Sequence, residues 1–351
     1  MNKIRLIQNS VVITVMLFCQ SVLAQETPTP LQALQNFGIA EAQIAQLERG
    51  EIVSYDVSET SQKELAIGVA MILPTALPHI VNYIKKGHLT SIHSDIIATA
   101  HLPANASVDS FKKFAFSDKH ADEASAFLDA EPGDEFNLSK QEFEHLKTLK
   151  QGLDDMDKKT LLQTANRTYR EFLLQRLQAY RKSGLAGIAA YSRGSGTADP
   201  AVELRTDANA SKAWAKYFPE LQQGWLNYPN GLPANAHEQY VLMNQRVEDR
   251  PTAILNHRIM LAGDTGGIIL TRQFYVGHSY NSTSVVAGGL PYKEGTLVFY
   301  ATRSSTDQVA GIGSSLKHSI GREQLKKTMI KRLQRLNKDL KLKPAKVAEE
   351  N

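Results

Sequence analysis

Apolar and polar residues alternate most regularly in the last third of the chain, and this alternation predicts an antiparallel sheet. Five runs show the two-residue period of β-strands and are separated by turn residues. They cover residues 240–247, 252–261, 268–280, 284–287 and 296–303. The glycine-rich segment 263–267 supplies residues that tolerate a positive φ, as a tight turn requires. We therefore expect a meander of strands from residue 240 to residue 303.

A long amphipathic helix is predicted after this meander, over residues 314–342. Ser314 and Ser315 are suitable N-cap residues. Basic residues such as Lys331 and Arg332 occupy one side of the predicted helix. We expect the other side to pack across the open face of the sheet. That other side is an apolar stripe of Leu316, Ile320, Leu325, Met329, Leu333, Leu336 and Leu340.

The N-terminal half shows a different order of elements. Strands are predicted over residues 51–57 and 64–73, followed by a helix over residues 77–86. A largely helical insertion covers residues 88–233, and its predicted helices are 139–149, 158–182 and 210–226. A strand pair, a helix, further strands and a terminal helix form the order of a helix-grip fold. The expected class is thus α+β, with a curved antiparallel sheet closed by a C-terminal helix.

Several polar side chains fall on predicted apolar strand faces. Side chains two positions apart share a face of a strand. His257 therefore lies among aliphatic residues, and Arg272, His278 and Tyr280 share the apolar face of the next strand. Arg303 belongs to the apolar face of the last strand. Arg258, the neighbour of His257, points to the opposite face.

A buried charge without a partner costs several kcal/mol, so these residues need an explanation. In one, they form a structural network in which Arg272 pairs with a carboxylate from a helix. In the other, the sheet encloses a cavity where polar groups meet the head group of a ligand. The second explanation predicts five ligand-binding residues, namely His257, Arg272, His278, Tyr280 and Arg303.

The N-terminus is typical of a secretory signal peptide over residues 1–24. Lys3 and Arg5 precede an apolar run, and cleavage is expected after Ala24. This predicts a periplasmic or secreted protein. Cys19 is the only cysteine and would be removed with the signal, so neither a disulfide nor a cysteine-based zinc site is expected. A linker with a short helix follows over 25–50, then one domain over 51–342 and a disordered tail over 343–351.

Charge and motifs exclude some functional classes and leave others open. Removing the two cationic residues Lys3 and Arg5 lowers the formal net charge from +4 to +2, which does not indicate nucleic-acid binding. No nucleophile elbow, zincin signature, dinucleotide-binding fingerprint or phosphate loop is present in the sequence. We therefore predict neither cofactor nor metal, and the sequence does not decide whether the protein is an enzyme.

A resemblance to known proteins rests on short segments of the chain, namely residues 165–171, 179–181, 184–191, 218–221, 228–229, 256–258 and 277–280. In these segments the chain resembles an uncharacterised family of secreted proteobacterial proteins. The C-terminal half of that family in turn resembles the START (helix-grip) superfamily. The resemblance implies an apolar cavity suited to a lipid or another hydrophobic ligand, and it implies no catalytic residues.

Three functional hypotheses follow. The first is a binding or carrier protein for a hydrophobic or amphipathic small molecule, whose basic terminal helix also contacts an anionic membrane surface. The second is a hydrolase or lyase that uses His257 or His278 as acid or base, with Arg272 holding an anion. The third is a non-catalytic interaction protein of the envelope, which exposed Trp214 and Trp225 side chains would favour.

Overall fold

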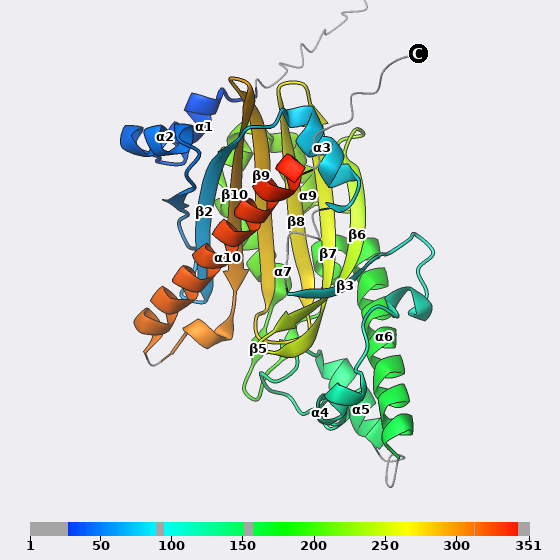
Figure 1. Ribbon diagram of the computed structural model, residues 1–351. Coiled ribbons are helices and arrows are strands. Elements are labelled where there is room, and N and C mark those ends of the chain that lie inside the picture. Colours follow the sequence, from blue (N-terminus) through cyan, green and yellow to red (C-terminus); the bar gives the residue numbers. More distant parts are fainter. Residues whose placement is uncertain (1–26, 89–94, 151–156, 312, 343–351) are drawn as a thin grey trace, which may run out of the picture.

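The computed structural model describes residues 27–88, 95–150, 157–311 and 313–342 of the 351-residue chain. The predicted signal peptide (1–24) and tail (343–351) lie outside the described residues. The described chain is an α+β protein built on one large antiparallel sheet and a long C-terminal helix (Figure 1). This architecture confirms the predicted fold class at that level.

The large sheet has eight strands in the order β1-β2-β10-β9-β8-β7-β6-β3, and every neighbouring pair is antiparallel. The connections β6–β7, β7–β8 and β9–β10 are two residues each, which confirms the predicted meander. β4 (Tyr191–Ser192) and β5 (Thr197–Ala198) form a separate small sheet. The large sheet consists of β1 (Val53–Asp56), β2 (Glu64–Leu73), β3 (Ile96–His101), β6 (His237–Val247), β7 (Arg250–Gly263), β8 (Gly266–Val276), β9 (Ser282–Tyr292) and β10 (Gly295–Ser305).

Strand β9 is much longer than the predicted run over residues 284–287. Gly288 and Gly289 interrupt its apolar pattern, and glycine inside a strand weakens the sequence signal. A Cβ atom at Gly288 would collide with the ring of Phe299 on the neighbouring strand. The glycine therefore makes room for an aromatic side chain, and tertiary packing rather than local propensity explains its place in the strand.

Two helices cover one side of the sheet, which we call the front face. They are α10 (Ser314–Leu342) and α3 (Leu77–Lys85), drawn red and cyan in Figure 1. The predicted apolar stripe of α10 is confirmed in its C-terminal part only. At the other end, the side chains of Leu316 and Ile320 are 69% and 50% exposed. The part that packs on β2 and β10 contains Met329, Leu333, Leu336 and Leu340.

The insertion covers the opposite side of the sheet, the back face. It also supplies one strand of the sheet, since β3 pairs with β6. The predicted helix over residues 210–226 is two helices, because Pro219 starts a new one after Phe218. The helices of the insertion are α4 (Ala121–Leu128), α5 (Lys140–Lys150), α6 (Lys158–Ser183), α7 (Pro200–Ala210), α8 (Lys212–Tyr217) and α9 (Pro219–Leu226). Near the start of the chain, α1 (Pro30–Asn36) and α2 (Glu41–Glu48) share a small apolar cluster with β1.

Candidate functional site

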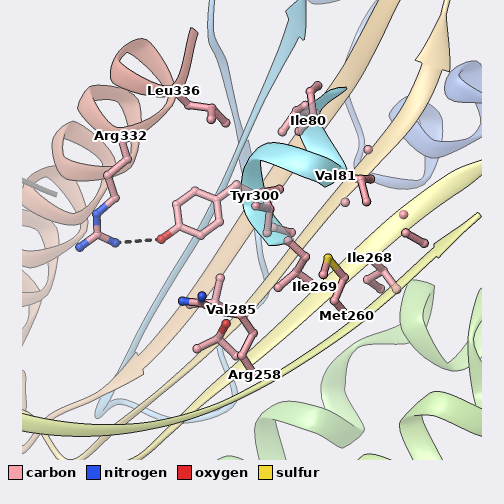
Figure 2. Close-up of a pocket in the computed structure, with 18 of the residues that line it drawn as sticks. Ile80, Val81, Arg258, Met260, Ile268, Ile269, Val285, Tyr300, Arg332 and Leu336 are labelled. Carbon is pink, nitrogen blue, oxygen red and sulfur yellow. Dashed lines mark hydrogen bonds between the residues drawn. The ribbon is translucent and has the colours of Figure 1, made fainter. Parts of the chain in front are cut away.

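A cavity of about 160 Å³ lies between the front face of the sheet and the two helices that cover it. Figure 2 shows Ile80 and Val81 of α3 and Leu336 of α10 around one space with Met260 and Ile269 of the sheet. Most of the lining side chains are apolar. The helices α10 and α3 lie over the same face of the sheet (Figure 1), and side chains of both line the cavity.

The only charged side chains among the described lining residues are two arginines, Arg258 of β7 and Arg332 of α10. Arg332 donates a hydrogen bond from its guanidinium to the hydroxyl of Tyr300, at 2.9 Å (Figure 2). The helical pattern places Arg332 on the basic outer side of α10. The structure instead turns it toward the cavity. The site therefore combines an apolar lining with positive charge and no lining carboxylate among the described residues.

Of the two cations, Arg258 has fewer polar partners in the described chain. It is half-buried as a residue, yet its Nε atom is fully buried and has no hydrogen-bond partner in the described chain. Burial lowers the pKa of Arg258, with no contribution from a neighbouring acid. On the same strand face, the Oδ1 atom of buried Asn256 also lacks a hydrogen-bond partner among described residues. Two polar groups in one apolar cavity are thus left unsatisfied, which is uncommon in native proteins.

His257 and Arg272 lie on the back face, away from this cavity. They are directly opposite each other on β7 and β8 and both are fully buried. The hydroxyl of Tyr180 on α6 joins them, at 2.8 Å from His257 Nδ1 and 2.9 Å from an Arg272 nitrogen. Arg272 also donates to the backbone carbonyl of Trp225 at 3.0 Å, and its guanidinium lies 4.1 Å from the Trp225 ring centre. The predicted helical carboxylate partner is wrong: a phenol, a carbonyl and an indole ring surround this cation.

The chemistry of this network defines its protonation. A guanidinium can only donate, so the Tyr180 hydroxyl accepts a hydrogen bond from Arg272 and donates one to His257 Nδ1. The other ring nitrogen, Nε2, then carries the hydrogen and lies 3.3 Å from a carboxylate oxygen of Glu238, although poorly aligned for a hydrogen bond. Burial lowers the pKa of His257 to about 4, against the opposing effect of Glu238. The imidazole is therefore neutral at pH 7.

His278 and Tyr280 do not share the face of Arg272, and that prediction is wrong. A β-bulge in β8 shifts the pairing between Leu255 and the next residue of β7, so Val276 faces forward. His278 follows onto the front side, where its Nε2 lies 2.7 Å from the hydroxyl of Thr252. Burial lowers the pKa of His278 to about 3. One inserted residue has reversed the alternation on which the prediction rests.

Tyr280 and Arg303 occupy two further environments. The Tyr280 hydroxyl donates to the Gln273 side chain at 2.8 Å, and Gln273 lines the front cavity. Arg303 lies on the back face and forms a buried ion pair with Glu64, at 2.5 Å. None of the five predicted ligand-binding residues is itself among the described residues that line the front cavity.

The back face contains a second cavity of about 330 Å³, lined in part by Trp214, Phe299 and Arg303. Asp207 also lines it and accepts a hydrogen bond from the Ser284 hydroxyl at 2.8 Å. Burial, followed by the charge of Glu64, raises the pKa of Asp207 to about 7. This cavity places a partly protonated carboxyl group among aromatic rings.

These positions bear on the functional hypotheses. His257 and His278 lie on opposite faces of the sheet, so they do not converge with Arg272 on one substrate. Trp214 and Trp225 are buried, with 4% and 2% exposure, so they do not form the exposed surface that an interaction protein would use. What the geometry builds is a small apolar cavity under α10, with cationic groups in its wall.

Comparison of the chain with models of known families, with curated proteins and with solved structures finds no match. Within the described ranges, no helix is both long and apolar enough to cross a membrane. No cluster of three or more His, Cys, Asp or Glu side chains that could hold a metal ion occurs in the same part of the chain.

The sequence places Arg258 and Arg332 on particular faces of their elements, but it does not show that the two side chains line one cavity. Alternation places Arg258 on the face opposite His257, which is correct. Both faces of β8 are largely apolar, as expected for a strand covered on both sides, so the pattern does not show which face α10 covers. Helical spacing places Arg332 on the basic side of α10, away from the apolar stripe. Only the packing of α10 on the front face shows that both side chains line one cavity.

Proposed function

We propose that the protein binds a small apolar or amphipathic molecule in the front cavity and acts as a binding or carrier protein. The observation that carries this proposal is the unfilled, apolar space of about 160 Å³ under α10 and α3. An engineered apolar cavity of about 150 Å³ in another protein binds benzene. Cavities for drug-sized ligands measure roughly 300–1,000 Å³. The part of the ligand that enters this cavity is accordingly no larger than about one aromatic ring.

The helix-grip (START-like) arrangement is part of the same proposal. The strand β2 lies beside the last strand β10, and the terminal helix crosses both, as the grip requires. We also propose that the protein is exported to the periplasm or the medium, on the basis of the signal-peptide pattern in residues 1–24.

The test is to fill the cavity. Ala287 of β9 lines it, and we expect Ala287→Phe to occupy the space that a ligand would use. Native mass spectrometry after gentle purification should find a small molecule on the wild-type protein and lose it in this variant. Val202→Phe is the matched control, since Val202 is 59% exposed on α7. The proposal is rejected if the wild type carries no molecule and also fails to bind added small aromatic compounds in calorimetry.

We also propose that the exposed side of α10 contacts anionic lipid head groups. Exposed Leu316 and Ile320 lie at one end of this helix beside Lys317, and further exposed lysines follow along it. Each basic residue near an anionic surface contributes about 1 kcal/mol. Sedimentation with phosphatidylglycerol vesicles should retain the protein, and the double variant Lys331→Glu, Lys338→Glu should release it. Equal binding to phosphatidylcholine vesicles would contradict this proposal.

A further inference from the structure

Arg258 is a positive charge in apolar surroundings that nothing in the described chain balances. Its Nε atom is buried without a hydrogen-bond partner, and the lining of the front cavity contains no carboxylate among described residues. Removing a charge from water without a counter-charge costs several kcal/mol. Two buried arginines have carboxylate partners, since Arg176 pairs with Glu142 and Arg303 pairs with Glu64. Arg272 has no carboxylate partner, but on the back face it donates to the Tyr180 hydroxyl and the Trp225 carbonyl and lies over the Trp225 ring. Arg258 has neither kind of partner in the described chain, and it lines the front cavity.

We infer that the ligand of the front cavity carries an anionic group that pairs with the Arg258 guanidinium; this inference rests on the proposed binding function of the cavity. The class of ligand is a compact apolar body, about one ring in size, with a carboxylate or a similar planar anion. A guanidinium matches a carboxylate through two parallel hydrogen bonds, which adds geometric selectivity to charge. The second cation, Arg332, already donates to Tyr300 and lies on the helix side of the same space.

The residues around Arg258 indicate how the ligand is oriented in the cavity. Thr271 lies directly opposite it on β8, and Asn256 is two positions away on the same strand face. Both line the cavity, so the polar part of the wall is concentrated around Arg258. The remaining lining toward α3 is aliphatic, with Ile80 and Val81. The ligand's anionic end therefore points to the middle of β7, and its apolar body points to the helices.

The experiment compares three isosteric probes: benzoate, benzamide and benzamidinium, which have the same ring and differ in the charge of the head group. Binding to the full chain is measured by calorimetry or by protein-observed NMR. We expect benzoate to bind about tenfold or more tightly than benzamide, as a charge-assisted hydrogen-bond pair in a buried site predicts. Benzamidinium should bind most weakly, because it places like charges together.

Two variants of Arg258 test whether this residue causes the preference for benzoate. Arg258→Met keeps a long side chain but removes the charge, so benzoate should lose its advantage while benzamide binding persists. Arg258→Lys should retain a reduced preference for the anion, since a lysine cannot form the paired fork. Arg246→Met is the matched control, because Arg246 is exposed on the neighbouring strand β6 and should leave all three affinities unchanged. Thermal unfolding of the ligand-free Arg258→Met protein should occur at a higher temperature than in the wild type, since a half-buried charge without a counter-charge in the described chain is gone.

The outcomes separate this inference from the proposed function. Equal affinities for benzoate and benzamide at a site that Ala287→Phe blocks would overturn the role of Arg258 and leave the binding function intact. A preference for benzoate that survives in Arg258→Met would overturn it as well. Failure of all three probes to bind the wild type would count against the proposed cavity function itself, as would binding that Ala287→Phe does not affect.

Discussion

Replacing Tyr180 by phenylalanine tests whether the His257–Arg272 network on the back face is a structural element. The Tyr180 ring is fully buried and stacks on Phe274, with ring centres 4.0 Å apart and planes 7° apart. Tyr180→Phe keeps this stacking and removes only the hydroxyl. That hydroxyl is neutral in the wild type, because burial raises the pKa of Tyr180 to about 12. The change therefore isolates two hydrogen bonds.

The loss of stability in Tyr180→Phe can be estimated from the buried polar groups that lose a hydrogen-bond partner. Loss of the hydroxyl leaves His257 Nδ1 without its donor and one Arg272 nitrogen without its acceptor. A buried group left unsatisfied costs about 1–3 kcal/mol, and more when it is charged. Arg272 keeps its bond to the carbonyl of Trp225, which limits the loss. We expect the free energy of unfolding to fall by about 3 kcal/mol, the cost of one neutral and one charged group left without a hydrogen-bond partner.

Urea denaturation at pH 7 measures this loss, provided that the slope of the transition is the same in variant and wild type. Tyr169→Phe is the matched control, because Tyr169 is also buried on α6 and its hydroxyl forms one hydrogen bond within the described chain, to the hydroxyl of Tyr275 at 3.0 Å. One neutral hydrogen bond should cost about 1 kcal/mol. If Tyr180→Phe proves no more destabilising than Tyr169→Phe, the two buried groups do not depend on the phenol and the reasoning is refuted.

Two further predictions concern stability. Burial lowers the pKa of His278 to about 3, below its unfolded value near 6.5, so the unfolded chain gains a proton first and stability is lost as pH falls below about 6.5. The stability difference between the wild type and His278→Gln should therefore shrink by about 1.4 kcal/mol per pH unit from 6.5 down to 4 in urea titrations, and a constant difference would contradict the pKa. A Cβ atom at Gly68 of β2 would collide with the Tyr55 ring, so Gly68→Ala should cost about 1–3 kcal/mol. Gly263→Ala, where nothing lies within 4 Å of the new atom, should change stability by less than about 0.5 kcal/mol, and equal effects of the two changes would refute the packing argument.

The meander, the terminal helix and the place of the insertion follow from local patterns. Alternation and two-residue turns indicate strands because backbone geometry alone sets the period of a strand. Tyr240 and Leu242, for example, face the same apolar cluster as predicted by their spacing. The long insertion helix α6 is similarly evident from its apolar stripe.

Tertiary structure decides the site. Both faces of the central strands are covered, so hydrophobicity does not distinguish the face under α10 from the face under the insertion. The bulge in β8 moves His278 to the front side, and no residue type near it signals the extra residue. Arg272 finds its partners on two helices far away in the chain, and Arg258 finds none, because neighbours in space are not neighbours in sequence. The strand period thus comes from the local chain, whereas the balance of charge in the cavity depends on which helix packs over it.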